Sequence, residues 1–283
     1  MSQPRVICTC REMHSYVEGV RARGKTVGLV PTMGALHAGH MSLVRASQAE
    51  CDETVATIFV NPTQFAPHED LNKYPRTFSA DLEKLAEHGV AAVFAPTNEE
   101  VYPVDFSTYV EPPEVSRSLE GDCRPGHFRG VATIVLKLFN VAPADVAFFG
   151  QKDFQQSLVI RHMVTDLNVP ITIRVCPIVR ESDGLAMSSR NVYLSSEERG
   201  RALALSRALN VAKGMVDQGE RNISKLETAM RDELLTGGVT TIEYACVVDA
   251  ESLASLAAVD GTAVALIAAR VGSTRLIDNC LLT

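Results

Sequence analysis

Short apolar, β-branched runs alternate with helical segments through the first two-thirds of this 283-residue chain. The runs lie at 27–30, 54–60, 91–94, 146–149 and 171–179. Apolar residues at helical spacing separate them, most clearly at 128–141 and 154–167. This alternation predicts an α/β fold with a Rossmann-like parallel sheet and crossover helices on both of its faces.

Polar, turn-forming residues at 180–184 interrupt this pattern, and we place a domain boundary there. The prediction is a Rossmann-like domain over 1–180 and a smaller α+β domain over 181–283. In the smaller domain, Ser195 and Glu198 have the spacing of a capping box before a long helix, and a second helix begins near Ser224. Three strand-like runs follow at 242–248, 263–269 and 275–282. The last two are too close for a crossover helix, so they predict a hairpin.

Charge and composition exclude several classes of protein. The chain has 27 basic and 34 acidic residues, and a net charge of −7 argues against non-specific binding to nucleic acid. Its beginning lacks the pattern of a signal peptide, and no apolar run approaches the ~18 residues that span a bilayer. The seven cysteines are scattered without a CxxC pair, which is typical of reduced thiols. We therefore expect a cytoplasmic protein with no membrane partner.

Two histidines follow the first of the predicted strands named above. The segment His37, Ala38, Gly39, His40 places two imidazoles at the start of a helix. In a parallel sheet, ligands bind at the carboxyl ends of the strands, where a helix N-terminus offers free N–H groups to an anion. The segment therefore predicts phosphate binding. Zinc ligation is an alternative, although no nearby Cys or His completes a tetrahedral set, and a pair of inert surface histidines is another.

Polar segments also follow two other predicted strands, at 60–65 and at 150–153. Taken alone, Lys152 and Asp153 would be read as a solvated surface pair. Together with the two histidines, these loops give one rim with cations and amides, which suits a nucleoside triphosphate and a second polar substrate. The segment 187–191 adds two hydroxyls and the Arg190 guanidinium, which suit phosphate oxygens, although an N-cap with a surface arginine is the alternative.

These segments resemble known proteins. His37 to His40 is similar to the HxGH signature of the nucleotidyltransferase superfamily that includes class I aminoacyl-tRNA synthetases, and 187–190 resembles an altered form of its second signature. Six segments resemble the pantothenate synthetase family in order and spacing, and the resemblance covers nearly the whole chain. They are 31–37, 59–65, 74–77, 124–128, 148–156 and 187–191.

The resemblance implies an AMP-forming ligase that makes a C–N (amide) bond. Its reaction would be the ATP-dependent condensation of (R)-pantoate with β-alanine to give pantothenate, AMP and pyrophosphate through a pantoyl-adenylate intermediate. ATP would be a substrate and Mg²⁺ a cofactor. The family also implies a nucleotide- and pantoate-binding first domain, a C-terminal lid domain and a homodimer.

The resemblance also assigns roles to residues. The catalytic set is His37, His40, Lys152 and Arg190. The ATP-binding set is Met33, Gly34, Ala35, Leu36, His37, Ala38, Gly39, His40, Gly150, Gln151, Lys152, Asp153, Val179, Met187, Ser188, Ser189 and Arg190. The pantoate pocket would contain Asn61, Gln64 and Gln156, and β-alanine would also contact Gln64. Asp81 matches a Mg²⁺ carboxylate of the family, although its neighbour Ala80 replaces an acid of some members. Arg124 and His127 match a segment that lines the cleft.

Two other functions remain open at this point. One is another HxGH nucleotidyltransferase, acting on a phosphorylated small molecule, which has no need of paired glutamines. The other is a non-catalytic nucleotide sensor or RNA-binding module, which would need a broader basic surface. For the enzyme, a phosphate neighbour favours a charged imidazole whereas burial opposes it, and we hypothesise that His37 is cationic when ATP is bound.

Overall fold

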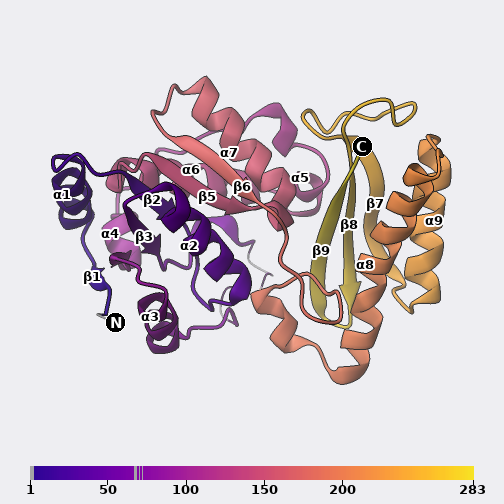
Figure 1. Ribbon diagram of the computed structural model, residues 1–283, viewed down its shortest axis with the longest axis horizontal. Coiled ribbons are helices and arrows are strands. Elements are labelled where there is room, and N and C mark those ends of the chain that lie inside the picture. The colour runs from indigo at the N-terminus through magenta and orange to yellow at the C-terminus, as the bar shows by residue number, and fades with distance from the viewer. Residues whose placement is uncertain (1–2, 67–68, 70, 72) are drawn as a thin grey trace. The chain divides into compact units, whose positions relative to one another are not determined.

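The structure is a computed structural model that describes residues 3–66, 69, 71 and 73–283. Its internal contacts divide the chain into two compact units, whose elements are labelled in Figure 1. The first unit contains Met1–Gln151 and Gln155–Pro177, and the second contains Lys152–Phe154 and Ile178–Thr283. The division after Pro177 lies near the boundary that we place at 180, and the short segment Lys152–Phe154 groups with the second unit.

The first unit is built on a six-stranded parallel sheet in the order β1-β4-β3-β2-β5-β6. In chain order, the strands are β1 Arg5–Ile7, β2 Val27–Val30, β3 Glu53–Thr57, β4 Ala92–Phe94, β5 Val146–Gly150 and β6 Thr172–Cys176. The parallel pairing confirms the predicted α/β class. β2 and β3 are central and almost wholly buried, which is why they read as continuous apolar runs.

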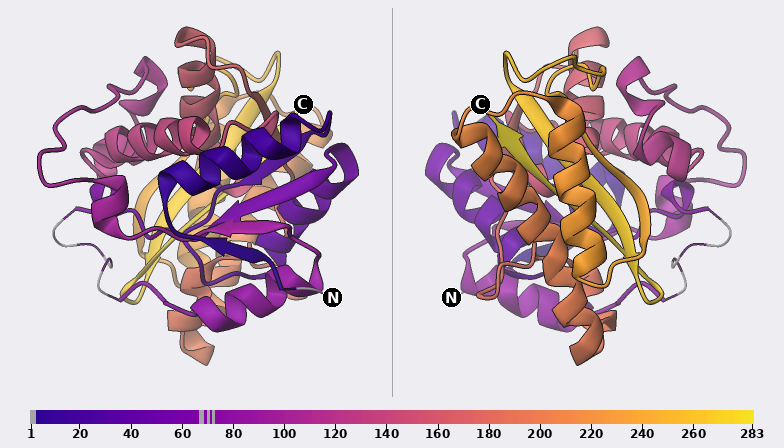
Figure 2. Two further views of the ribbon diagram at one scale, coloured as in Figure 1. Left: turned by 90° about the vertical axis from the view of Figure 1, so that its left-hand side faces the viewer. Right: turned by 90° about the vertical axis from the view of Figure 1, so that its right-hand side faces the viewer.

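Helices cover both faces of this sheet (Figure 2). They are α1 Cys10–Arg21, α2 Ala38–Glu50, α3 Phe78–Glu87, α4 Asn98–Val101, α5 Glu120–Cys123, α6 His127–Val141 and α7 Phe154–Asp166. The chain proceeds from β2 to β4 in one direction along the sheet and from β5 to β6 in the other. Right-handed crossovers therefore place α2 and α3 on one face and α6 and α7 on the other. The direction reverses between β2 and β5, and this is where parallel sheets bind ligands.

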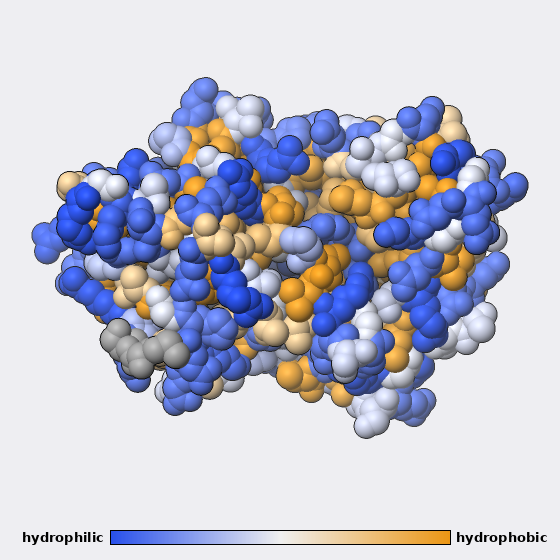
Figure 3. Space-filling model, in the orientation of Figure 1, coloured by the Kyte–Doolittle hydropathy of each residue, from blue (hydrophilic) through white to orange (hydrophobic). Residues whose placement is uncertain are grey.

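The core of the first unit lies between the sheet and these helices. Val30, Val44, Leu85, Val93 and Phe148 are buried in one cluster that joins β2, α2, α3, β4 and β5. In Figure 3, hydrophilic residues cover most of the surface over α1, α2 and α3, as expected for the outer faces of amphipathic helices. Among the described residues, no helix combines the length and the apolar character that crossing a membrane requires.

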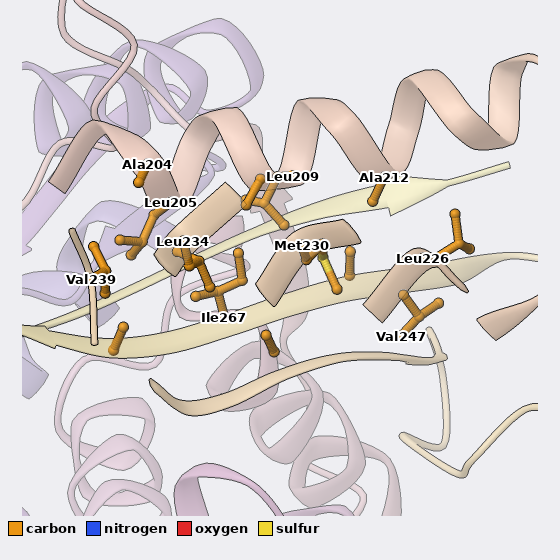
Figure 4. Close-up of a cluster of buried hydrophobic side chains, with 14 of the residues drawn as sticks. Ala204, Leu205, Leu209, Ala212, Leu226, Met230, Leu234, Val239, Val247 and Ile267 are labelled. Atoms are coloured by element: carbon orange, nitrogen blue, oxygen red, sulfur yellow. The ribbon is translucent and has the colours of Figure 1, made fainter. Parts of the chain in front are cut away.

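The second unit packs two helices on a three-stranded antiparallel sheet. The elements are α8 Ser196–Asp217, α9 Ile223–Thr236, β7 Thr241–Asp249, β8 Ala263–Val271 and β9 Thr274–Leu282. Leu205, Leu209, Leu226, Met230 and Ile267 fill the space between helices and sheet (Figure 4). The capping box of Ser195 with Glu198 is confirmed, and so is the hairpin of β8 and β9.

The structure also contains two elements that the sequence reasoning missed. β1 has only three residues, and its Val6 is 41% exposed, so it gives little apolar signal. For α1, the buried residues Met13, Val17 and Val20 have the helical spacing that would have revealed it. β3 is shorter than predicted, because the chain leaves the strand and the N–H of Phe59 donates to the carbonyl of Thr32 at 3.1 Å.

Candidate active site

His37 and His40 are hydrogen-bonded to the backbone at the start of α2. His37 is the N-cap, and its Nδ1 accepts from the N–H of Gly39 at 3.2 Å. The N–H of His37 donates to Nδ1 of His40 at 3.2 Å, and the ring centroids are 4.1 Å apart. Because both Nδ1 atoms accept hydrogen bonds, each ring in this arrangement is neutral and has its proton on Nε2. A cationic His37, as we hypothesise with ATP, would have to break its cap.

The turn that follows β2 has an unusual backbone. Gly34 has φ +84° and Ala35 has φ +49°, both in the left-handed region that L-residues with a Cβ rarely adopt. The N–H of Gly34 donates to Oγ1 of Thr32 at 3.1 Å, and this Oγ1 donates to the carbonyl of Thr57 at 2.6 Å. The turn is thereby attached to the end of β3.

Asp81, the predicted Mg²⁺ ligand, lies in the first turn of α3 and is 1% exposed. Its carboxylate accepts from the N–H groups of Ala35 at 2.9 Å and Leu36 at 2.8 Å, and from Oγ1 of Thr77 at 3.1 Å. A Mg²⁺ ligand needs an oxygen open to the ion and its waters. As placed, Asp81 does not fit that role. Within the described ranges, no group of three or more His, Cys, Asp or Glu side chains could hold a metal ion.

Asn61 fixes the orientation of Gln64, its neighbour in the predicted pantoate pocket. Asn61 is 1% exposed, and its Oδ1 accepts from the N–H of Thr63 at 3.4 Å and from the Tyr102 hydroxyl at 2.8 Å. Its Nδ2 therefore donates to Oε1 of Gln64 at 3.1 Å. The Nε2 of Gln64 then points the other way and lies 3.0 Å from Sδ of Met33. The arrangement makes Gln64 a hydrogen-bond donor on the side of Met33.

Arg124 and His127 hold the backbone of Gln64 from another direction. Nδ1 of His127 donates to the carbonyl of Gln64 at 2.9 Å, and Nη1 of Arg124 donates to Nε2 of His127 at 3.1 Å. Burial, with the Arg124 charge beside it, lowers the pKa of His127 to about 4. Glu69 accepts from Nε of Arg124 at 2.6 Å. The pair thus positions Gln64 with a neutral imidazole.

His127 should make stability dependent on pH. The unfolded chain protonates this residue near its ordinary pKa of 6.5, whereas the folded chain does so only near 4. Stability is therefore present above pH 6.5 and lost as the pH falls toward 4. Between pH 7 and 5 we expect the free energy of unfolding to fall by about 2 kcal/mol more in the wild type than in His127→Gln. Urea unfolding at both pH values measures this difference, and equal losses in the two proteins would refute it.

Gly130 lets α6 approach the short helix η1 (Pro62–Gln64) closely. A Cβ on Gly130 would lie 2.7 Å from the backbone N of Gln64 and closer still to the carbonyl of Thr63. We expect Gly130→Ala to destabilise the protein by about 1–3 kcal/mol and to displace Gln64. The matched control is Gly214→Ala, in the interior of α8, where a Cβ meets nothing within 4 Å. It should stabilise by about 0.5–1 kcal/mol, and thermal unfolding of both variants tests the pair of predictions.

In the second unit, Val179 and Met187 pair at the base of a hairpin. The N–H of Met187 donates to the carbonyl of Val179 at 3.0 Å, and Arg180 bridges to Ala186. The Arg180 guanidinium makes two hydrogen bonds to Asp278, at 2.7 and 3.0 Å, and the Asp278 side chain is 2% exposed. This ion pair attaches the hairpin to β9, so the two predicted nucleotide contacts lie on a rigid segment.

The hairpin leads directly into the predicted phosphate-binding residues of this unit. Ser188 is the N-cap of the short helix η5 (Ser189–Tyr193), and its hydroxyl accepts from the N–H of Arg190 at 3.2 Å. Nδ2 of Asn191 donates to Oε1 of Glu181 at 2.7 Å. The predicted set Ser188, Ser189 and Arg190 is therefore contiguous and held by the hairpin.

The segment after β5 contains the remaining predicted residues. Gly150 ends the strand, and Gln151–Asp153 forms the short helix η4 before α7. The carbonyl of Lys152 accepts from Nδ2 of Asn279 at 3.0 Å, and Gln156 lies partly buried in the first turn of α7. Since β5 pairs with β2, the loops after Val30 and Gly150 leave adjacent strands at their carboxyl ends.

The comparisons with known proteins identify the family. A family model described as "Pantoate-beta-alanine ligase" matches residues 5–281. The chain belongs to the pantoate–β-alanine ligase family. It is 51% identical over 278 residues to the pantothenate synthetase of Thermotoga neapolitana, with 98% of this chain and 99% of the relative covered. It is 54% identical over 272 residues to that of Acidobacterium capsulatum, with 94% and 91% covered.

Solved structures of this family have the same fold. The pantothenate synthetase of Thermus thermophilus aligns with a TM-score of 0.92 at 42% identity, covering 98% of each chain. The pantoate–β-alanine ligase of Francisella tularensis, described as complexed with β-γ ATP and β-alanine, aligns with a TM-score of 0.82 at 32% identity. That alignment covers 98% of this chain and 97% of the other. The two-domain ligase fold is thus confirmed, and a different nucleotidyltransferase is not favoured.

Proposed function

We propose that this chain catalyses the ATP-dependent condensation of (R)-pantoate with β-alanine to give pantothenate, AMP and pyrophosphate through pantoyl adenylate. The observation that carries the proposal is the family match over residues 5–281. The ligands of the Francisella tularensis structure support two of the substrates, ATP and β-alanine. The local geometry supports it as well, because the histidine turn follows β2 next to the point where the strand order reverses.

In the proposed site, the ATP phosphates contact the turn from Met33 to His40 at the N-terminus of α2. Backbone N–H groups and the positive end of the helix dipole favour an anion there. His37 and His40 donate from Nε2, because their Nδ1 atoms accept backbone hydrogen bonds. Lys152 and Arg190 supply positive charge to the triphosphate. Ser188 and Ser189 add hydroxyl donors, while Gly150, Gln151, Asp153, Val179 and Met187 contact the nucleotide.

The pantoate pocket in this proposal combines amide donors with apolar walls. Gln64 directs Nε2 to the side of Met33, and Gln156 supplies the second amide. Pantoate has a carboxylate and two hydroxyls, which accept from such donors, and a gem-dimethyl group that favours apolar contact. Asn61 is buried with its oxygen occupied by hydrogen bonds, so its role is to orient Gln64. The pocket would discriminate against analogues that leave a buried amide unpaired.

The reaction has two displacements. First, the pantoate carboxylate oxygen attacks the α-phosphorus of ATP, the α–β P–O bond breaks, and pyrophosphate leaves. Second, the amine of β-alanine attacks the acyl carbon, the bond to the AMP oxygen breaks, and the amine loses a proton. The first step brings an anion to a polyanion, so positive charge and N–H donors must act most strongly where charge develops in the transition state.

Mg²⁺, a homodimer and a cytoplasmic location complete the proposal. Mg²⁺ usually keeps several waters and accompanies the phosphates of its substrate, and no step above depends on a protein ligand for it. Burial raises the pKa of Cys246 to about 12 and of Cys280 to about 11, so both stay protonated thiols, which suits a reducing compartment. The lid role of 181–283 stays a prediction.

The test is a product analysis. The chain is incubated with ATP, MgCl₂, (R)-pantoate and β-alanine, and the products are separated by liquid chromatography with mass detection. We expect AMP, pyrophosphate and pantothenate in equal amounts. Without β-alanine, pantoate should support exchange of labelled pyrophosphate into ATP. Formation of ADP, or of a stable nucleotidyl ester with a phosphorylated acceptor, would contradict the proposal.

A further inference from the structure

One face of α3 grips the turn that precedes His37. Oδ2 of Asp81 accepts from the N–H of Ala35 at 2.9 Å, and Oδ1 accepts from the N–H of Leu36 at 2.8 Å. One turn further along α3, Nζ of Lys84 donates to the carbonyl of Leu36 at 2.6 Å. The N–H and the carbonyl of Leu36 are thus both held by charged side chains of the same helix.

The turn needs such a partner because its backbone is strained. Ala35 adopts φ +49°, where its Cβ is disfavoured, and such a conformation persists only where the surroundings stabilise it. At the preceding glycine, a Cβ would come within 3.1 Å of Oδ2 of Asp81 and 3.2 Å of Ile58. The fit between turn and carboxylate is therefore close, and Thr77 fixes the carboxylate by donating to Oδ2 at 3.1 Å.

The gripped residue is directly followed by the histidine pair. Leu36 is 2% exposed, and the next residue is the N-cap of α2, whose N–H donates to His40. A displacement of the Leu36 peptide would therefore move both the cap and the ring of His40. Charge-assisted hydrogen bonds are the strongest available for fixing a peptide in this way.

We propose that Asp81 and Lys84 form a backbone anchor that positions His37 and His40 for the ATP phosphates, and that Asp81 acts in this way instead of as a Mg²⁺ ligand. This inference rests on the proposed function and adds positioning residues to it. The buried carboxylate has its oxygens occupied by two backbone N–H groups and a hydroxyl, so binding an ion would release the strained turn.

The experiment compares Asp81→Asn with the wild-type chain. Asparagine keeps the size of the side chain but replaces one acceptor oxygen with an NH₂ group that faces a backbone N–H. We expect kcat/KM for ATP to fall by about 100-fold, because misplaced phosphate donors lose transition-state contacts. The KM for β-alanine should stay within about twofold, since the anchor contacts only the histidine turn. The half-saturating concentration of Mg²⁺ at saturating ATP should also stay within about twofold of the wild type.

A second readout does not depend on activity. In the ¹⁵N spectrum of histidine-labelled protein without ligands, His37 and His40 should show unprotonated Nδ1 atoms in the wild type. Asp81→Asn and the milder Lys84→Met should both shift these resonances. If Asp81→Asn does not fold, the Lys84→Met spectrum and its ATP kinetics test the anchor by themselves.

The matched control is Leu85→Ala on the same helix. Leu85 is 1% exposed, so its truncation destabilises α3 without removing the anchor side chains. It should leave the imidazole resonances and the KM for ATP near their wild-type values. The proposal is overturned if Asp81→Asn raises the Mg²⁺ requirement by roughly tenfold or more, as loss of a ligand would, or if the anchor variants leave both imidazoles unshifted. If the wild type forms no AMP, the proposed function fails, whereas the spectra still test the anchor.

Discussion

Replacing His37 with Asn is expected to slow pantoate-dependent exchange of pyrophosphate into ATP by about 10²–10³-fold, because one donor to the reacting phosphates is lost. The substitution keeps the cap. Nδ1 of His37 accepts from the N–H of Gly39, and the Oδ1 of an asparagine occupies a similar position. We therefore expect the free energy of unfolding to stay within about 0.5 kcal/mol of the wild type. The measurement is the exchange rate together with a urea unfolding curve.

His37→Gln is the matched variant for the other ring nitrogen. Its Nε2 lies near the position of the imidazole Nε2–H, but no atom replaces the Nδ1 acceptor. It should retain more exchange activity than His37→Asn while losing about 1 kcal/mol of stability. The opposite order, with the glutamine variant less active and more stable, would show that the Nε2 donor is not what the reaction needs.

Gln64→Glu is expected to raise the KM for pantoate by about 100-fold or more, because a buried carboxylate then meets the carboxylate of the substrate without a donor. The replacement is nearly isosteric, and Oε1 of the glutamate can still accept from Nδ2 of Asn61. The donor that points to the side of Met33 is what disappears. The KM for ATP should change little. Steady-state kinetics with each substrate varied in turn measures this split.

The control for charge is Gln64→Met, which removes the amide without adding an anion. It should raise the KM for pantoate about tenfold, the value of one hydrogen bond, and less than the glutamate variant does. Equal effects of either variant on ATP and pantoate would place Gln64 outside the pantoate pocket.

Much of the fold was accessible from the sequence because the periodicities are local. The alternation of buried strands with amphipathic helices predicted the parallel sheet, and Ser195 with Glu198 predicted the start of α8. The missed elements lack such signals or were overlooked. β1 is three residues long and partly exposed, whereas α1 has an apolar stripe of Met13, Val17 and Val20.

The candidate site was accessible only in part. The sequence identified the turn at His37 and the amide at Gln64, because their motifs are contiguous. It gave no sign that Tyr102 would donate to Asn61 at 2.8 Å, or that Lys84 would donate to Leu36, since these contacts join residues far apart in the chain. A signal for the Arg180–Asp278 pair was present, because an acid within the apolar run of β9 needs a partner.

The sequence by itself determined the order of strands and helices, the family and the identity of the chemical groups, because each depends on residues that are neighbours along the chain. Only the tertiary structure decided how those groups are used. It occupied Nδ1 of His37 and His40 with backbone donors, directed the amide of Gln64 toward Met33, and buried Asp81 against a strained turn. The physical reason is that hydrogen-bond direction and burial are set by contacts between distant segments, which a linear pattern does not encode.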